Sequence, residues 1–261
     1  MSLHTNTVGY RQMDRRRLGL TGLELSVIGL GTVKFGRNQG VKYPHGFDLP
    51  DMDHLRNLLA LARDLGINTL DTAPAYGLSE ERLGALLHGQ RQEWIIVGKA
   101  GEEFEGGESR YIFTPEHFEF SLHRSLKRLG TDYLDIFLIH SDGNDLEILN
   151  DGALIAKMQD FKARGLVRAI GASTKTVDGG IRALGLLDCA MVAYNPEYTA
   201  EEPVLSHAAK TGKGILVKKA MGSGHVTENN PLRFALGHPG VTSAIVGTIS
   251  PDHLRENIHS S

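Results

Sequence analysis

The sequence predicts a (β/α)8 barrel, in which eight parallel strands are surrounded by helices. Short apolar runs alternate with helix-like segments eight times along the 261 residues, and most connections are short enough for parallel crossovers. Two short segments, residues 15–18 and 24–27, flank a glycine-containing turn, so we expect a short N-terminal β-hairpin before the first unit. Residues 1–14 form a polar leader in this interpretation, and residues 15–261 form a single barrel domain, since barrels of this length are common.

The composition is that of a globular protein with a buried core. Hydrophobic residues make up 41% of the chain and charged residues 23%, and the net charge of −3 is not the profile of a nucleic-acid-binding protein. Apolar runs are all far shorter than the roughly 20 residues that span a bilayer. The single cysteine, Cys189, excludes an intramolecular disulfide and a cysteine metal cluster. We therefore expect a cytoplasmic protein without nucleic-acid or membrane partners, and the composition leaves its oligomeric state open.

The first four units carry recognisable helix-start and helix-stop signals. Apolar residues at helical spacing begin at Leu55, and Ser79 stands where it could cap the next helix. Thr114 followed by Pro115 opens a third helix, which Gly130 ends. The predicted strands cover residues 27–30, 67–71, 94–99 and 134–140, and the predicted helices cover residues 51–65, 79–87, 114–129 and 151–164.

The last four units follow the same alternation with shorter elements. Their predicted strands cover residues 169–172, 191–194, 214–218 and 242–246, and their predicted helices cover residues 177–187, 203–210, 231–236 and 251–258. Two connections are much longer than the others, residues 32–50 and residues 100–113. Each follows a strand, so we expect both on the face that carries the active site in barrels.

Four polar residues stand at the ends of three successive predicted strands. Asp71 ends the second strand and Tyr76 follows it by five residues, while Lys99 and His140 end the third and fourth strands. Any one of them could be a turn, packing or core residue, but four chemically compatible groups on one face are improbable as an accident. The carboxyl ends of parallel strands meet at one face, so we expect these side chains to form a proton-transfer site.

The chemistry of this quartet suits a reversible proton transfer to a carbonyl oxygen. A tyrosine ordinarily titrates near pH 10, and the ammonium of Lys99 is expected to lower the pKa of Tyr76. Asp71 would hold Lys99 in place and keep it charged. His140 could orient a carbonyl group or stabilise its oxygen as charge develops.

Several motifs, in their order along the chain, resemble those of the aldo-keto reductase family. They are residues 18–19 with 28–32, residues 70–77 with Ser79 and Glu80, residues 97–99, residues 126–140, and residues 246–248 with 254–257. The resemblance implies an NADPH-dependent carbonyl reductase. In it Tyr76 donates the proton, Lys99 tunes it, Asp71 anchors Lys99, and His140 positions the carbonyl group.

The expected cofactor site lies in the loops after the seventh and eighth strands. The chain lacks a Gly-x-Gly-x-x-Gly motif in a βαβ unit, whereas barrels often bind phosphate at these two loops. Of the two lysines that end the seventh strand, Lys218 is expected to point inward. The resemblance places the following residues on cofactor-contacting positions: Gly31, Thr32, Ser173, Gly222, Ser223, Gly224, Gly247, Thr248, His253, Glu256 and Asn257. We expect Asp71, Thr174 and Lys218 to contact the cofactor as well.

Four residues around the expected cofactor site differ from the family's usual pattern. Thr174 replaces an asparagine, and Met191 replaces a glutamine that often holds the nicotinamide amide. Ala220 replaces an aromatic residue that commonly stacks on the nicotinamide ring, and His253 replaces an arginine that often binds the 2′-phosphate. We expect NADP(H) to remain the preferred cofactor.

Other functions compatible with the sequence stay open. A barrel lyase could use Lys99 or Lys218 as a Schiff-base nucleophile. A cofactor-binding regulatory subunit could sense redox state with slow turnover. A metal-dependent hydrolase is discounted and no metal is expected, because the 12 histidines are scattered without metal-ligand spacing.

Overall fold

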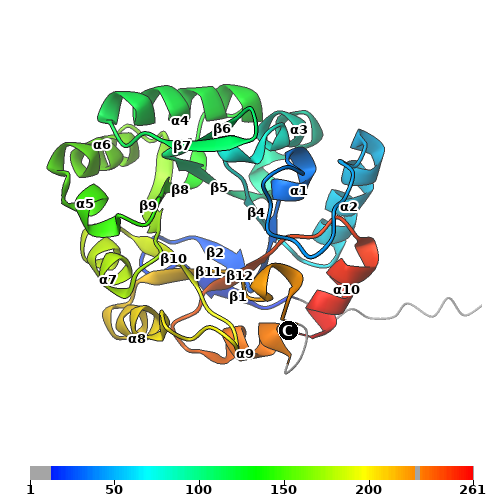
Figure 1. Cartoon of the computed structure of the whole chain (residues 1–261). Coiled ribbons are helices and arrows are strands. Elements are labelled where there is room, and N and C mark those ends of the chain that lie inside the picture. The colour runs from blue at the N-terminus through cyan, green and yellow to red at the C-terminus, as the bar shows by residue number, and fades with distance from the viewer. Residues whose placement is uncertain (1–12, 227–229, 261) are drawn as a thin grey trace, which may run out of the picture.

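Eight parallel strands close into a barrel in the computed structural model, which describes residues 13–226 and 230–260 (Figure 1). Each strand pairs in parallel with its neighbours, and the last pairs with the first to close the barrel. The predicted (β/α)8 fold is therefore confirmed. In order around the barrel the strands are β3 (Ile28–Gly31), β4 (Thr69–Asp71), β5 (Ile95–Ala100), β8 (Leu134–His140), β9 (Val167–Ser173), β10 (Cys189–Ala193), β11 (Gly214–Lys218) and β12 (Ser243–Val246).

The predicted N-terminal hairpin is also present. Strands β1 (Arg15–Arg17) and β2 (Glu24–Ser26) pair antiparallel. Leu18, Leu23 and Leu25 of this hairpin are fully or almost fully buried and belong to the same apolar cluster as side chains of the barrel strands. The hairpin therefore adds to the core. Residues 1–12 of the predicted leader lie outside the described residues.

Helices surround the barrel, as the ribbon shows (Figure 1). They begin and end within a few residues of the predicted bounds. Thr114 accepts a hydrogen bond from the backbone of His117, and Gly130 adopts a left-handed conformation with φ of 63°, so the predicted cap and stop of the helix Pro115–Leu129 are confirmed. The surrounding helices are α2 (Met52–Asp64), α3 (Ser79–Leu86), α4 (Pro115–Leu129), α6 (Gly152–Ala163), α7 (Val177–Leu186), α8 (Glu202–Thr211), α9 (Pro231–Gly237) and α10 (Pro251–His259).

One predicted cap is wrong. Ser79 is the first residue inside α3 and Leu78 is the cap residue, without a side-chain hydrogen bond. The Ser79 hydroxyl instead lies 2.7 Å from the hydroxyl oxygen of Thr32 and 3.1 Å from that of Thr72. Its hydroxyl therefore ties the start of α3 to the loops after β3 and β4.

Short elements inside the connections were not predicted, because each is too short to show a periodic pattern. The connection 32–50 contains α1 (Val33–Gly36), and the connection 100–113 contains an antiparallel hairpin of β6 (Glu102–Glu105) and β7 (Glu108–Tyr111). The others are α5 (Asp145–Asn150) and the 3-10 helices η1 (Pro74–Tyr76), η2 (Arg91–Glu93) and η3 (Gly222–Gly224). Among the described residues, the structure contains no helix of the length and apolarity needed to cross a membrane.

Candidate active site

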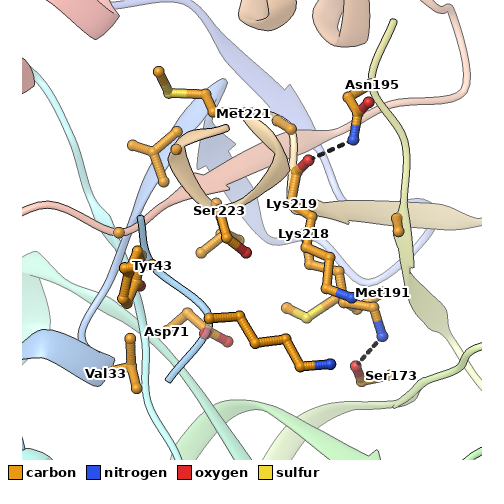
Figure 2. A pocket seen from close by; sticks show the side chains of 18 of the residues that line it. Val33, Tyr43, Asp71, Ser173, Met191, Asn195, Lys218, Lys219, Met221 and Ser223 are labelled. Atoms are coloured by element: carbon orange, nitrogen blue, oxygen red, sulfur yellow. Dashed lines mark hydrogen bonds between the residues drawn. The ribbon is translucent and has the colours of Figure 1, made fainter. Parts of the chain in front are cut away.

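A cavity of about 970 Å³ opens where the barrel strands end (Figure 2). Residues of both long connections line it, among them Val33 and Tyr43 from the first and Glu102 and Tyr111 from the second. The expectation that these connections lie on the active-site face is therefore met. The predicted site residues in its lining are Gly31, Asp71, Tyr76, Lys99, His140, Ser173, Thr174, Lys218, Ser223, Gly224, Gly247, Thr248, His253, Glu256 and Asn257.

Two predicted cofactor residues do not belong to this lining. Thr32 is fully buried, and its hydroxyl donates a hydrogen bond to the backbone oxygen of Asp71 at 2.8 Å. Gly222 begins η3 beside Val226, which an added Cβ atom would meet at 2.6 Å. Both residues shape the loops that carry the lining.

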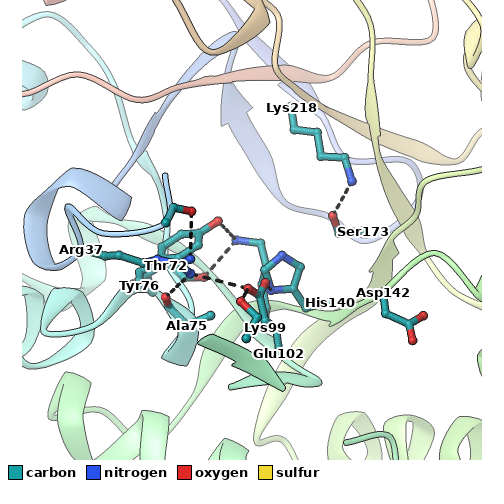
Figure 3. A network of polar contacts seen from close by, with 12 residues as sticks. Arg37, Thr72, Ala75, Tyr76, Lys99, Glu102, His140, Asp142, Ser173 and Lys218 are labelled. Carbon is teal, nitrogen blue, oxygen red and sulfur yellow. Dashed lines mark hydrogen bonds and ion pairs between the residues drawn. The ribbon is translucent and has the colours of Figure 1, made fainter. Parts of the chain in front are cut away.

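The quartet predicted from the strand ends comes together in this cavity. Figure 3 labels Tyr76, Lys99 and His140, and Figure 2 labels Asp71. The Lys99 ammonium donates hydrogen bonds to Asp71 Oδ1 at 2.5 Å, to the backbone oxygen of Thr72 at 3.1 Å and to the Tyr76 hydroxyl at 3.1 Å. The Tyr76 hydroxyl in turn donates to Asp71 Oδ2 at 3.3 Å. Only 1% of the Lys99 side chain and 5% of the Asp71 side chain are exposed, so the pair is shielded from water.

Two glycines place Tyr76 beside Lys99. Tyr76 ends η1, and the next residue, Gly77, has a φ of +61° that favours glycine. A Cβ atom on Gly77 would lie 2.3 Å from the backbone oxygen of Gly36, and one on Gly36 would lie 2.5 Å from the backbone oxygen of Tyr76. The close approach of α1 to the Tyr76 turn therefore depends on both residues lacking a side chain.

The expected lowering of the Tyr76 pKa is wrong. Burial raises the pKa of Tyr76 well above its ordinary value, and the negative charges of Asp71 and Glu102 raise it further. Tyr76 is therefore a protonated phenol at neutral pH and can act as a proton donor.

His140 faces Tyr76 and carries no charge at neutral pH. The two rings are arranged edge to face, with centroids 6.4 Å apart. Burial lowers the pKa of His140 well below its ordinary value, and the positive charges of Lys99, Lys218 and other cationic side chains contribute. His140 is therefore a neutral hydrogen-bonding group.

Two charged residues at this site were missed by the sequence interpretation. Glu102 Oε2 lies 3.1 Å from His140 Nδ1, and Glu102 Oε1 lies 3.6 Å from Arg37 Nη1. Both residues lie in the long connections, where no periodic pattern indicates which side chains point inward. The only feature of the sequence that pointed to functional residues in these connections was their length.

Lys218 points into the cavity from the end of β11, as expected. Its ammonium donates hydrogen bonds to the Ser173 hydroxyl at 2.9 Å and to the backbone oxygen of Thr174 at 2.7 Å (Figure 2). Burial lowers its pKa to about 8, against the opposing effect of the Glu201 carboxylate. Thr174 Oγ1 is buried without a hydrogen-bond partner in the described part of the chain. This wall therefore presents the Lys218 cation to the cavity, and the unpaired Thr174 hydroxyl is buried.

The loop after β12, the neighbour of β11 in the barrel, has the features of a phosphate-binding site. An added Cβ atom on Gly247 would lie 2.7 Å from the Tyr43 hydroxyl, so the long connection 32–50 packs closely against the loop after β12. That loop leads into α10, whose first turn is capped by Ser250, and a helix N-terminus favours an anion. With Lys34 and Lys42 also in the lining, these residues fit an anionic dinucleotide.

Comparisons with known proteins agree with this arrangement. The model of the Aldo/keto reductase family matches residues 27–231. The chain is 52% identical to PA4992 of Pseudomonas aeruginosa, a protein regarded as an aldo-keto reductase, with 97% of each chain covered and a TM-score of 0.87.

More distant relatives include the D-threo-aldose 1-dehydrogenase of a Pseudomonas species, which is 29% identical over 81% of this chain and 70% of the relative. The uncharacterised oxidoreductase YqkF of Bacillus subtilis is 25% identical over 95% of this chain and 91% of the relative. The holo form of the aldo-keto reductase AKR11C1 from Bacillus halodurans is 23% identical, with 95% and 91% of the chains covered and a TM-score of 0.82, and supports the fold alone. From the family match, this chain belongs to the aldo/keto reductase family of carbonyl oxidoreductases, which use nicotinamide cofactors.

Proposed function

We propose that this protein reduces an aldehyde or ketone to an alcohol with NADPH, and that Tyr76 donates the proton. The observation that carries the proposal is the buried Tyr76 hydroxyl, which lies 3.1 Å from the Lys99 ammonium and 3.3 Å from Asp71 at the cavity wall. Bound NADPH would supply the hydride to the carbonyl carbon. The carbonyl oxygen would take the proton from Tyr76, so that an alcohol forms.

Each member of the quartet has a separate task in this reaction. Loss of the Tyr76 proton leaves a phenolate, which the Lys99 ammonium stabilises through the contact that already exists. Asp71 holds that ammonium in position through its 2.5 Å hydrogen bond. The His140 ring packs edge to face against the ring of Tyr76, and His140 can contact the reacting oxygen.

The same arrangement can run in the opposite direction and oxidise an alcohol. The relationship to D-threo-aldose 1-dehydrogenase makes aldoses useful test substrates for oxidation, beside a panel of aldehydes and ketones for reduction. We propose NADPH as the preferred reductant, with Lys218, Thr248 and His253 as contacts for its phosphate groups; all three line the cavity.

A Schiff-base lyase is the second candidate, and one observation favours Lys218 as its nucleophile. The pKa of Lys218, lowered to about 8, leaves part of its amine unprotonated at neutral pH. Lys99 is a poor candidate because Asp71, Thr72 and Tyr76 engage its ammonium. Covalent trapping of a carbonyl compound by borohydride on Lys218, without consumption of NADPH, would support the lyase.

The decisive experiment is Tyr76→Phe, with Tyr43→Phe as the matched control. Both tyrosines line the cavity, and the pKa of Tyr43 is likewise raised, to about 12, but only Tyr76 contacts Lys99. General acid catalysis contributes about 10²–10⁴-fold to the rate of a reaction. Tyr76→Phe should therefore lower kcat of NADPH oxidation by at least about 10²-fold. Fluorescence titration should show NADPH binding unchanged in Tyr76→Phe. If Tyr76→Phe retains more than about a tenth of kcat, a loss under roughly 1.4 kcal/mol, Tyr76 is not the proton donor.

A further inference from the structure

Glu102 presents its two carboxylate oxygens to different partners (Figure 3). Oε1 accepts a hydrogen bond from the Ser109 hydroxyl at 2.7 Å and lies 3.6 Å from Arg37 Nη1. Oε2 lies 3.1 Å from Nδ1 of His140. Only 12% of the Glu102 side chain is exposed, so its orientation is set by these neighbours.

Arg37 is held in place by groups other than carboxylates. Its guanidinium donates hydrogen bonds to the backbone oxygens of Ala75 at 3.0 Å, Gln39 at 2.8 Å and Gly40 at 3.1 Å. It also stacks over the ring of Phe104, 3.4 Å from the centroid. Of the carboxylates in residues 13–226 and 230–260, Glu102 alone lies within ion-pair distance of Arg37. Arg37 therefore keeps Oε1 on its own side and leaves Oε2 for His140.

The contact with Glu102 bears on which nitrogen of His140 carries the proton. His140 Nδ1 is sealed from solvent, and no group in the described residues makes an aligned hydrogen bond to it. A neutral imidazole has one N–H and one lone pair. A bare Nδ1 places partial negative charge 3.1 Å from a carboxylate oxygen in a water-excluded site, whereas an Nδ1–H group places partial positive charge there, which favours the Nδ1–H form even without an aligned hydrogen bond.

Protonation of both nitrogens is disfavoured by the surroundings. The charged groups that act on the ring from other elements are the cations Lys99, Lys218, Lys175 and Arg37 and the carboxylate Glu102, with Tyr76 facing it as a phenol. Burial and the four cations lower the pKa of His140 well below its ordinary value. The ring is therefore neutral at pH 7 and carries a single proton.

We propose that Glu102 is a positioning residue that fixes His140 as the Nδ1–H tautomer, so that Nε2 serves the cavity as a hydrogen-bond acceptor. His140 lines the cavity with 18% of its side chain exposed, while Nδ1 is sealed. An acceptor at this place binds the hydroxyl of an alcohol, and Tyr76 remains the donor for a carbonyl oxygen. This role toward the reacting oxygen rests on the proposed function, whereas the tautomer itself does not.

The test is the ¹⁵N NMR signature of the His140 ring in the full chain without cofactor. The protein contains 12 histidines, so the His140 signals are assigned by their absence in His140→Gln. In the wild type at pH 7.5 we expect a protonated Nδ1 and a strongly downfield, pyridine-like Nε2. The opposite pattern overturns the proposal, and this measurement needs no variant of Glu102.

Glu102→Gln should reverse the tautomer. Arg37 and Ser109 would retain the amide oxygen at the Oε1 position, so the amide NH₂ would face His140 and require a bare Nδ1. The pyridine-like shift should then move from Nε2 to Nδ1. An unchanged spectrum of His140 in Glu102→Gln overturns the role of Glu102.

Glu103→Gln is the matched control on the same strand. Glu103 also contacts a histidine, His117, with Oε1 3.0 Å from the ring Nε2, and it pairs with Arg124. This substitution should leave the His140 signals unchanged, and the same reversal in both variants would overturn a specific role of Glu102. Because these spectra are recorded without substrate, their outcome is separate from that of Tyr76→Phe. Retained catalysis in Tyr76→Phe would refute the proposed proton donor and leave the tautomer assignment untouched.

Discussion

Asp71→Asn tests the buried ion pair at the centre of the site. The substitution keeps the size of the side chain and removes the negative charge that lies 2.5 Å from the Lys99 ammonium. The backbone oxygen of Thr72 and the Tyr76 hydroxyl remain as neutral partners of that ammonium. Because only 1% of the Lys99 side chain is exposed, water cannot replace the lost charge.

The expected loss of stability is large for a single substitution. Removing one partner of a buried ion pair costs about 3–5 kcal/mol. One kcal/mol shifts Tm by roughly 2–4 °C in a chain of about 150–250 residues, so the expected decrease in Tm is roughly 6–20 °C. Reduction of carbonyl substrates should be lost at the same time, because Lys99 is no longer held beside Tyr76.

Thermal unfolding followed by circular dichroism measures this effect, with Asp252→Asn as the control. Asp252 pairs with Arg255, but 85% of its side chain is exposed, so the control should change stability by less than about 1 kcal/mol. The double variant Asp71→Asn/Lys99→Met removes both buried charges and should recover much of the lost stability without recovering activity. A decrease in Tm under roughly 2 °C, or a double variant no more stable than Asp71→Asn, would refute the reasoning.

Three further substitutions test the turn, the histidine and the cofactor contact. Gly77→Ala would bring a Cβ atom within 2.3 Å of the Gly36 backbone oxygen and displace the Tyr76 turn, so kcat should fall. Gly106→Ala is the control, because Gly106 has the same φ of +61° but open space around it, and this variant should retain activity. The pKa of His140 is lowered in the folded state, so its contribution to stability is complete above pH 6.5, the ordinary pKa, and is lost as the pH falls below it. Urea unfolding at a series of pH values should therefore show that the free energy of unfolding decreases more steeply below pH 6.5 for the wild type than for His140→Asn. The two slopes should differ by at most about 1.4 kcal/mol per pH unit, and parallel curves would contradict this prediction. His253→Ala should weaken NADPH binding more than NADH binding in a fluorescence titration, and equal weakening would refute a contact with the 2′-phosphate.

The alternation of strands and helices carried most of the fold prediction. Periodicity located the eight barrel strands, and caps such as Thr114 with Gly130 located helix ends, because these signals arise within a few neighbouring residues. Ser79 shows the limit of this reasoning. Its position suggested a cap, but its hydroxyl bonds to Thr32 and Thr72, which a local sequence pattern does not reveal.

The quartet could be predicted, whereas its electrostatics could not. Asp71, Lys99 and His140 end neighbouring strands, and parallel pairing brings such ends to one face in any barrel. The direction of the Tyr76 pKa shift depends on how deeply the phenol is buried and on Glu102, which comes from a distant connection. Sequence spacing contains no measure of that burial.

The sequence by itself determined the barrel, the strand ends and the quartet that they carry, since periodicity is a local property of the chain and parallel pairing brings the strand ends to one face. Only the tertiary structure decided that Glu102 lies between Arg37 and His140 and that Tyr76 stays protonated. These contacts join two connections whose paths follow from packing over the cavity. Their energies also depend on the exclusion of water, which arises only when the whole barrel is folded.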